Sequence, residues 1–448
     1  MIGLQDLFPP HQFSDWLTQL KKELKEDGMS RLNQIDPIEG IPFISNGHQD
    51  NTPRIVSQPG VMPYYRGTTQ QSNQWTNIFH IEANDSSSDN KKILDALMNG
   101  ADCVRFDLRQ SNALNLIALT KGIQFEFIQS QWAINSQDHW QAILSHFDGK
   151  LPENTSVLYD HFEVKNEELF NDLLNYFADK QHPFLHVNGF AYHECGSNAS
   201  HEIAFCLAVG NEYLELLLNR GFNIDEAAAC LYFSVGIGSN YFIEVAKIRA
   251  LRWGWTTIIS AYSPAHSCSH IMQLNAEIGW MNKSFKDPNT NYLRQTTEAM
   301  SAVLGGVNGL LIYPYDLNSS EGSSTKSNRM ARTIPLILQD ESFLNQVIDP
   351  LGGSYTTEQL TNELGKSSWG LFQAIHAQEG PSYKGYEILE QHIKFIKELR
   401  INRISNNEDK FIGMNCFTNP SVQKNSFSRR ISYLSFEFLQ LENHIENA

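Results

Sequence analysis

The stretch FLHVNGFAYHECGSNASHEIAFCLAVGNEYLELLLNRGFNIDEAAACLYFSVGIGSNYFIEVAKIRALRW (184–253) decides the fold. It alternates two short β-like runs, FLHVNGF (184–190) and LYFSVGI (231–237), with two longer segments of helical pattern at 198–219 and 239–253. This order, with apolar strands, is typical of parallel strands joined by crossover helices. We therefore expect an α/β fold built on a parallel sheet.

The same alternation extends toward both ends of the chain. The further candidate strands are CVRFDL (103–108), IQFEFI (123–128), SVLYDHF (156–162), TTIISAYS (256–263) and GLLIYPYD (309–316), and further helices are expected at 292–304 and 327–346. Seven such strands favour a TIM (β/α)8 barrel with one strand unrecognised over an open sheet. A barrel typically needs about 250 residues. The 448 residues therefore accommodate one barrel with extensions.

The two ends of the chain have a different pattern. Apolar residues recur at helical spacing from Phe13 to Leu24, and 36–74 is rich in Pro, Gly, Asn and Gln, which predicts a helix followed by an extended arm. A strong helical pattern at 384–400 predicts a C-terminal helix. We therefore divide the chain into an N-terminal helix and extended arm (1–90), a TIM-type barrel (91–380) and a C-terminal helical extension (381–448).

Charge and composition narrow the possible partners. The net charge is −16 and basic residues are interleaved with acidic ones, which argues against nucleic acid and anionic membranes as partners. The N-terminus lacks the features of a signal peptide, and no apolar run is long enough to cross a bilayer. The six cysteines are widely spaced, without a C-x-x-C pair. We expect a cytoplasmic protein without nucleic-acid or membrane partners.

Two short motifs have both a chemical and a structural interpretation. HSCSH (266–270) has zinc-ligand residue types, but its spacing matches no established site, so we expect a loop at the C-terminal end of a strand and no metal site. GIGSN (236–240) stands between a strand and a helix, where phosphate-binding turns occur. It lacks the third glycine and the later acidic residue, so a tight turn capped by Ser239 or Asn240 is favoured.

Titratable residues also follow two of the candidate strands. Asp160 and His161 come at the end of one strand, and Tyr192, His193 and Glu194 come just after another. TIM-barrel enzymes build their active sites at the C-terminal ends of the strands. An acid–base site and a hydrogen-bonded loop or interface are both consistent with these residues.

Longer stretches resemble the methylmalonyl-CoA mutase family. They are DPIEGIPF (36–43), PGVMPYYRG (59–67), YHECGSNASHEIAFCLAVGNEYLELLLNRG (192–221), VAKIRALRWGW (245–255), DPNTNYLRQTTEAMSAVLGG (287–306) and ARTIPLILQDESFLNQVIDPLGGSYTTEQLT (331–361). The resemblance runs almost end to end. It implies a TIM barrel that, in catalytic chains, is threaded by a CoA ester and followed by a cobalamin domain with a D-x-H-x-x-G motif.

The resemblance also indicates where this chain departs from catalytic members. Catalytic chains have tyrosine and histidine at the positions of Phe190 and Ala191, and the histidine binds the thioester carbonyl of the substrate. Their tyrosine-bearing loop is replaced here by TTQQSNQ (68–74), and no D-x-H-x-x-G precedes the end at Ala448. Losing one such hydrogen-bond donor typically costs about 10²–10³ in rate. We therefore expect no catalytic residue and, as a residual pocket, Tyr192, His193, Glu194 and Arg66.

The function that the resemblance implies is that of a small subunit. It would bind no cofactor and pair with a large methylmalonyl-CoA mutase subunit that carries adenosylcobalamin. The complex, an isomerase, interconverts (R)-methylmalonyl-CoA and succinyl-CoA. Two alternatives stay open: a catalytic barrel whose cobalamin domain is a separate chain, which would need the groups lost at Phe190 and Ala191, and a standalone barrel enzyme or scaffold.

Overall fold

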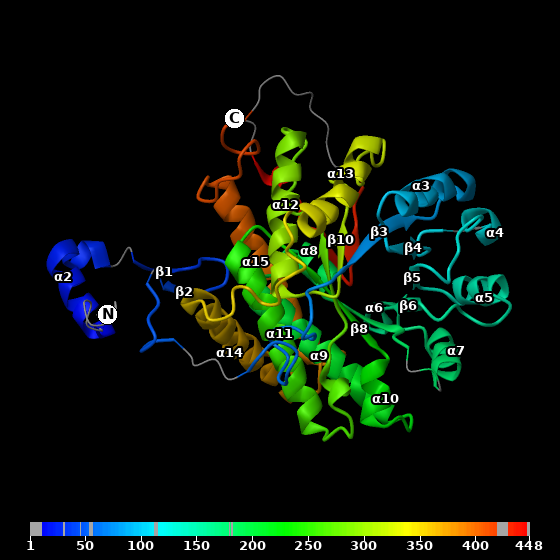
Figure 1. Ribbon diagram of the computed structural model, residues 1–448, viewed down its shortest axis with the longest axis horizontal. Helices are drawn as coiled ribbons and strands as arrows, with labels where there is room; N and C mark the ends of the chain where they lie inside the picture. Colours follow the sequence, from blue (N-terminus) through cyan, green and yellow to red (C-terminus); the bar gives the residue numbers. More distant parts are fainter. Residues whose placement is uncertain are drawn as a thin grey trace, which may run out of the picture.

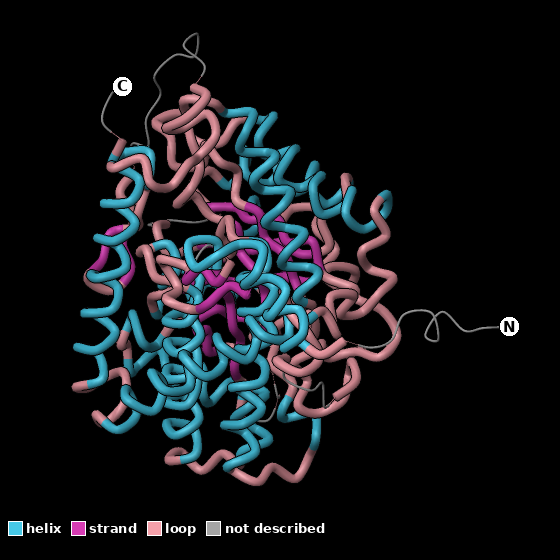
Figure 2. Tube along the Cα trace, turned by 90° about the vertical axis from the view of Figure 1, so that its left-hand side faces the viewer, coloured by secondary structure: helices cyan, strands magenta, loops and turns pink. Residues whose placement is uncertain are grey.

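The computed structural model describes residues 11–29, 32–44, 46–52, 57–111, 115–178, 180, 182–418 and 429–445. Within these residues, parallel strands form a closed barrel in the order β10-β3-β4-β5-β6-β7-β8-β9. Figure 2 shows the strands at the centre with helices around them, so the predicted TIM barrel is confirmed. The strands are β3 (Thr76–Glu82), β4 (Cys103–Asp107), β5 (Gln129–Ile134), β6 (Thr155–Tyr159), β7 (Leu185–Asn188), β8 (Leu231–Gly236), β9 (Leu274–Ile278) and β10 (Gly309–Ile312).

Helices follow the strands and cover the outside of the barrel. Several begin at a side chain that accepts a hydrogen bond from the first turn, as Asp85, Asn166 and Asn198 do for α3, α7 and α9. The helices between strands are α3 (Ser86–Met98), α4 (Leu116–Leu119), α5 (Gln137–His146), α6 (His161–Val164), α7 (Glu167–Phe177), α8 (Gly189–Glu194), α9 (Ala199–Leu218), α10 (Ile224–Ala229), α11 (Tyr241–Ala261), η1 (Ser267–His270) and α12 (Pro288–Gly305).

Two predicted strands are wrong. Residues 256–263 mostly belong to α11, because Ile258 and Ile259 face the core while the Thr257 and Ser260 hydroxyls bond to carbonyls four residues earlier. Residues 123–128 form turns, and the strand there is the following β5. A short apolar run has no periodicity long enough to separate strand from helix or loop.

Three strands escaped the sequence analysis, namely β3, β5 and β9. Their sequences, TNIFHIE, QSQWAI and LNAEI, interrupt the apolar pattern with polar residues, and several of these are buried in the barrel. β3 lies inside the range expected to be the arm. The barrel therefore begins before residue 91, the boundary expected from the sequence.

The chain continues after the barrel with helices and a hairpin. α13 (Thr325–Leu336) runs into the π-helical turn η2 (Ile337–Glu341), and α14 (Tyr355–Ala377) packs against α9 and α11. The predicted C-terminal helix is α15 (Gly385–Ser405). The extension also contains the antiparallel pair β11 (Ser432–Tyr433) and β12 (Phe436–Glu437), followed by η3 (Leu441–His444). The final segment is thus not wholly helical.

The N-terminal helix α2 (Phe13–Met29) is present as predicted and stands apart from the barrel in Figure 1. It leads into the short hairpin of β1 (Asn33–Ile35) and β2 (Pro42–Ile44). The apolar stripe of α2, from Phe13 to Leu24, is partly or largely exposed. Among the described residues, no helix combines the length and apolar character needed to cross a membrane.

The helices α9 and α11 pack closely against each other and against β8. Gly210 of α9 faces the rings of Trp255 and Phe233, which a Cβ atom would approach to 2.9 Å and 3.0 Å. These rings are themselves buried, at 1% exposure each. Because protein interiors are close-packed, neither ring has free space to move into.

Gly210→Ala should therefore destabilise the fold by about 1–3 kcal/mol through overpacking, despite the helix propensity of alanine. Gly370→Ala in α14 is the matched control, because nothing lies within 4 Å of the added Cβ there. The control should be neutral or stabilising by up to about 1 kcal/mol. Urea denaturation of both variants tests this, and equal stabilities would contradict the packing described.

Candidate functional site

The residues singled out from the sequence lie on the short helix α8, directly after β7. Asn188 begins it by accepting a hydrogen bond from the Ala191 amide at 3.0 Å. Successive side chains of α8 point to different surroundings. Phe190 and Ala191 line a cavity at the barrel mouth, whereas His193 lines a separate cleft.

Tyr192 and Glu194 have structural contacts. The Tyr192 ring stacks on Phe205 at 4.3 Å, and its hydroxyl donates to the Leu389 carbonyl at 3.3 Å. The Glu194 carboxylate accepts hydrogen bonds from the amides of Trp280 and Met281 at 2.8 Å and 3.1 Å. Burial raises the pKa of Glu194. These contacts fix the loop after β9 against α8.

Arg66 does not join the other members of the expected residual pocket. Its Nε lies 2.6 Å from Asp349 Oδ2, and its Nη1 donates to the Ser57 carbonyl at 3.0 Å. Asp349 also pairs with Arg249 of α11, on the outside of the barrel. The four residues proposed from the sequence therefore do not form one pocket.

The chain's own C-terminal segment covers the barrel mouth. The cavity there has a volume of about 370 Å³ and is lined both by the ends of the strands and by residues of the β11–β12 region. The Tyr433 hydroxyl donates to Asp160 Oδ2 at 2.8 Å, and the Leu439 amide donates to the Glu194 carbonyl at 2.6 Å. Arg429 pairs with Glu82 of β3 at 2.5 Å. These bonds tie the segment to three sides of the mouth.

A buried polar network fills the barrel interior below this cavity. Arg105 of β4 lies 2.6 Å from Glu277 of β9, and its Nε donates to Gln131 of β5 at 2.9 Å. The Tyr232 hydroxyl accepts hydrogen bonds from Arg105 at 3.2 Å and from Gln131 at 3.0 Å. Tyr313 donates to the second oxygen of Glu277 at 2.8 Å. Because these residues come from different sides of the barrel, they close its axis.

The mouth cavity carries charges of both signs. Arg109 pairs with Asp107 at 2.6 Å. Burial raises the pKa of Asp160 to about 6 and that of Glu163 to about 7, and the Asp160 carboxylate adds to the second shift. Burial also lowers the pKa of His80 to about 3. Burial in the mouth thus shifts Asp160, Glu163 and His80 toward their uncharged forms.

The two short motifs have structural roles. HSCSH precedes β9 and follows α11, so it lies at the N-terminal end of a strand and not, as expected, at a C-terminal end. Cys268 is exposed and His270 Nδ1 bonds to the Ser267 carbonyl. No group of three ligand-type residues could hold a metal within the described ranges. GIGSN connects β8 to α11 through a bend at Ser239, and the expected cap from the Asn240 side chain is not formed.

Comparison with known proteins agrees with this architecture. The family model described as methylmalonyl-CoA mutase matches residues 164–442. The methylmalonyl-CoA mutase small subunit of Porphyromonas gingivalis is 30% identical in a match of 438 residues that covers 92% of this chain and 70% of that protein. The chain belongs to the methylmalonyl-CoA mutase family. The Rhizobium meliloti and human mitochondrial methylmalonyl-CoA mutases are 37% and 33% identical, over 47% and 55% of this chain. These matches span 30% and 34% of those two relatives.

Sequence reasoning located α8 but missed the network on the barrel axis. Part of its signal was available, because polar residues occupy alternate positions in these strands, Arg105 with Asp107 in β4 and Asn275 with Glu277 in β9. In a barrel, such positions point either inward or toward the helices. Such a pattern predicts inward-pointing polar side chains, but it does not identify the partner of each, which here lies 172 positions away.

The raised pKa of Glu163 gives a pH prediction. Its pKa rises from 4.5 to about 7 on folding, so the ionised form costs the wild-type fold stability as the pH rises through this window. Glu163→Gln stays neutral and should therefore gain on the order of 1–3 kcal/mol over the wild type between pH 5 and pH 8. Chemical denaturation at both pH values measures the gain.

Glu126→Gln is the control, because Glu126 lies in an exposed loop. Its stability difference from the wild type should be small and the same at both pH values. If the stability difference between Glu163→Gln and the wild type were also the same at both pH values, the raised pKa of Glu163 would be contradicted.

Proposed function

We propose that this chain is the non-catalytic small subunit of a heterodimeric, adenosylcobalamin-dependent methylmalonyl-CoA mutase. The closed barrel axis is the observation that carries the proposal. In this function the chain stabilises a catalytic large subunit, and the complex isomerises (R)-methylmalonyl-CoA to succinyl-CoA and back. We also propose that the chain is cytoplasmic.

The Arg105–Glu277 pair opposes passage of a CoA ester along the axis. A thioester entering the barrel would have to separate this pair, which is buried at 4% and 2% side-chain exposure. Breaking a buried ion pair leaves an uncompensated charge, at a cost of about 3–5 kcal/mol. The network is also bonded through Gln131 and Tyr232, so no single side chain can swing away freely.

The residues at the family's catalytic positions support the same conclusion. Phe190 stacks on Tyr313 at 5.2 Å and meets Trp280 and Phe438 edge-on. These rings form an apolar wall where a catalytic chain has a polar group. The Ala191 side chain is a methyl group and cannot donate a hydrogen bond to a thioester carbonyl.

The cofactor does not fit the barrel mouth. A volume of about 370 Å³ lies near the lower end of pockets that hold drug-sized ligands, and a corrinoid with its nucleotide tail is far larger. The segment from Ile431 to Phe438 also lies between the barrel and the space above it. We therefore assign adenosylcobalamin to the large subunit and no cofactor to this chain.

The helix α2 supports a role in pairing with a large subunit. Trp16, Leu17 and Leu20 share one face and remain partly exposed, with Phe13 stacked on Trp16 at 5.4 Å. A helix with one apolar face is stable when that face is covered. We propose that the partner covers it, within an obligate interface of more than about 2,000 Å².

Co-purification with a large methylmalonyl-CoA mutase subunit tests the proposal. We expect a stable 1:1 complex and mutase activity with adenosylcobalamin only in samples that contain the large subunit. Trp16→Asp and Leu20→Asp should each weaken the complex at least tenfold in a binding assay while leaving the melting temperature of this chain unchanged. Thr18→Asp, at an exposed position, is the control. Turnover of an acyl-CoA by this chain alone would refute the assignment.

Ala191→His tests whether one missing group explains the inactivity. The imidazole would enter a mouth still closed by Tyr433 and an axis still closed by the Arg105–Glu277 pair. The variant should therefore show no mutase activity without a partner, in an assay with methylmalonyl-CoA and adenosylcobalamin. Measurable turnover would mean that the barrel had kept a working substrate path.

A further inference from the structure

A second cavity lies outside the barrel axis and shares no lining residue with the mouth cavity. It has a volume of about 670 Å³ and is open to solvent. Its walls come from the turn before β2, the end of α8, the start of α11, the α12 helix, the α15 helix and the segment after it. We call it the α11 cleft. Its size is that of a small-molecule site.

His193 provides an unsatisfied polar atom in the wall of the α11 cleft. The residue is 3% exposed, and its Nδ1 lies 3.4 Å from Glu202 Oε2. Glu202 is held by Lys247 at 2.7 Å and by the Gly236 amide at 2.7 Å. Among the described residues Nε2, on the other side of the ring, has no hydrogen-bond partner, and Nδ1 has no closer partner than this carboxylate. Since buried polar atoms normally form hydrogen bonds, His193 Nε2 is a candidate to bond to a ligand.

The start of α11 adds a positive electrostatic end to the cleft. Gly238, Ser239 and Asn240 line the cleft and lead into this helix of 21 residues. The Asn240 side chain donates to Asp36 at 3.2 Å and does not cap the helix. The N–H groups of a first helical turn and the helix dipole together favour an anion.

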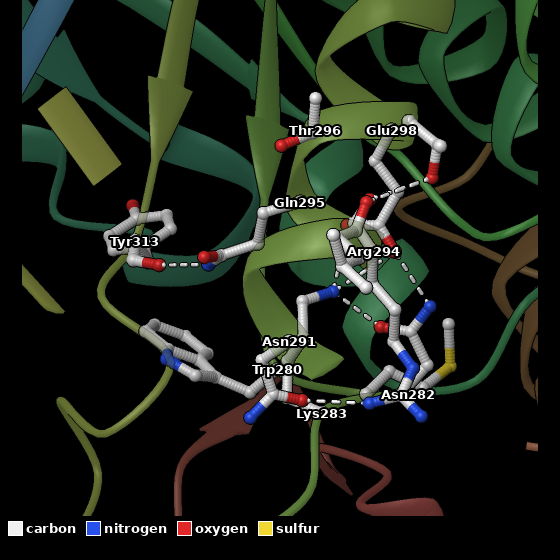
Figure 3. Close-up of polar contacts among 12 residues, drawn as sticks. Trp280, Asn282, Lys283, Asn291, Arg294, Gln295, Thr296, Glu298 and Tyr313 are labelled. Atoms are coloured by element: carbon white, nitrogen blue, oxygen red, sulfur yellow. Dashed lines mark hydrogen bonds and ion pairs between the residues drawn. The ribbon is translucent and has the colours of Figure 1, made fainter. Parts of the chain in front are cut away.

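Two arginines in the cleft have neutral partners. Arg294 of α12 bonds to Thr290 Oγ1 at 3.0 Å, to Asn291 Oδ1 at 2.9 Å and to a backbone carbonyl. Figure 3 shows its side chain beside Asn291 and Asn282. Arg400 of α15 bonds to the carbonyls of Gly196 and Ser197 at 3.1 Å and 2.9 Å. Both guanidinium groups can therefore still pair with an anion.

The acidic residues of the cleft are already engaged. Glu39 accepts from the Ala199 amide at 2.8 Å, and Glu244 lies 2.5 Å from Lys247. Asp409 pairs with Arg403 at 2.7 Å, and Asp36 accepts from the amides of its own turn. These carboxylates act electrostatically on Arg400, but none of them forms a close ion pair with Arg294 or Arg400 among the described residues.

We propose that the α11 cleft binds a small organic anion that also carries a hydroxyl group, either a hydroxycarboxylate or a phosphate ester. The anionic group pairs with the arginines and the first turn of α11. Because Nδ1 of His193 faces a carboxylate, Nε2 accepts a hydrogen bond from the ligand hydroxyl. Ile243, Leu293 and Phe411 contact its carbon skeleton. This site is independent of the proposed function, since it leaves the barrel axis closed.

Isothermal titration calorimetry on the purified full chain tests the site. The probes are L-malate and glycerol 3-phosphate, with succinate and orthophosphate as anions without an alcohol, and glycerol as the neutral control. We expect saturable binding of malate or glycerol 3-phosphate with a Kd below about 1 mM. The matching probe without the alcohol should bind at least tenfold more weakly. Absence of saturable binding, or equal binding with and without the alcohol, would overturn the proposal.

Variants locate the binding in the cleft. Arg294→Gln and His193→Gln should each raise the Kd at least tenfold. Leu293→Glu places a carboxylate at the rim, where the side chain is 70% exposed, so it should weaken binding without changing the melting temperature. Ile117→Glu on α4, at 76% exposure, is the matched control and should bind as the wild type does. Unchanged binding by Leu293→Glu would place the ligand elsewhere.

Discussion

The pairing of Arg105 with Glu277 across the barrel determines what the rest of this molecule can do. Removing two charges from water costs several kcal/mol each, and only close contact with full hydrogen bonding offsets the cost. Gln131, Tyr232 and Tyr313 supply those hydrogen bonds, so the network depends on side chains from several strands. A barrel built around such a network has a fixed, filled axis, and the function proposed above uses its outer surfaces.

The C-terminal segment covers the mouth of a barrel whose axis is already filled by side chains. The C-terminal segment packs its own side chains over the strand ends above this network. Phe438 meets Phe190, and Tyr433 reaches Asp160. The segment thereby buries apolar surface that an open mouth would expose to water. The axis network and the C-terminal segment therefore both block the barrel mouth. A substitution that removed one of them would leave the other in place.

The sequence predicted the barrel well where strands were apolar and helices long, as in β7, α9, β8 and the first part of α11. It did not predict β3 and β9. Their polar side chains are stabilised inside the barrel by partners that lie far away in the sequence. Arg105 and Glu277 are 172 positions apart, so no local pattern could pair them. Similarly, the family resemblance located Phe190 and Ala191. That the C-terminal segment covers them is a result of tertiary packing, which the spacing of residues in the sequence does not predict.

The short helix α8 separates two environments within a few residues. Ala191 faces the mouth, whereas His193 faces the α11 cleft. Because the side chains of an α-helix advance by about 100° per residue, positions two apart point in nearly opposite directions. The residue at position 191 therefore places no direct constraint on the residue at position 193. A chain whose barrel axis is closed can thus keep a polar cleft on the far side of the same helix, where Glu202 Oε2 lies 3.4 Å from the imidazole.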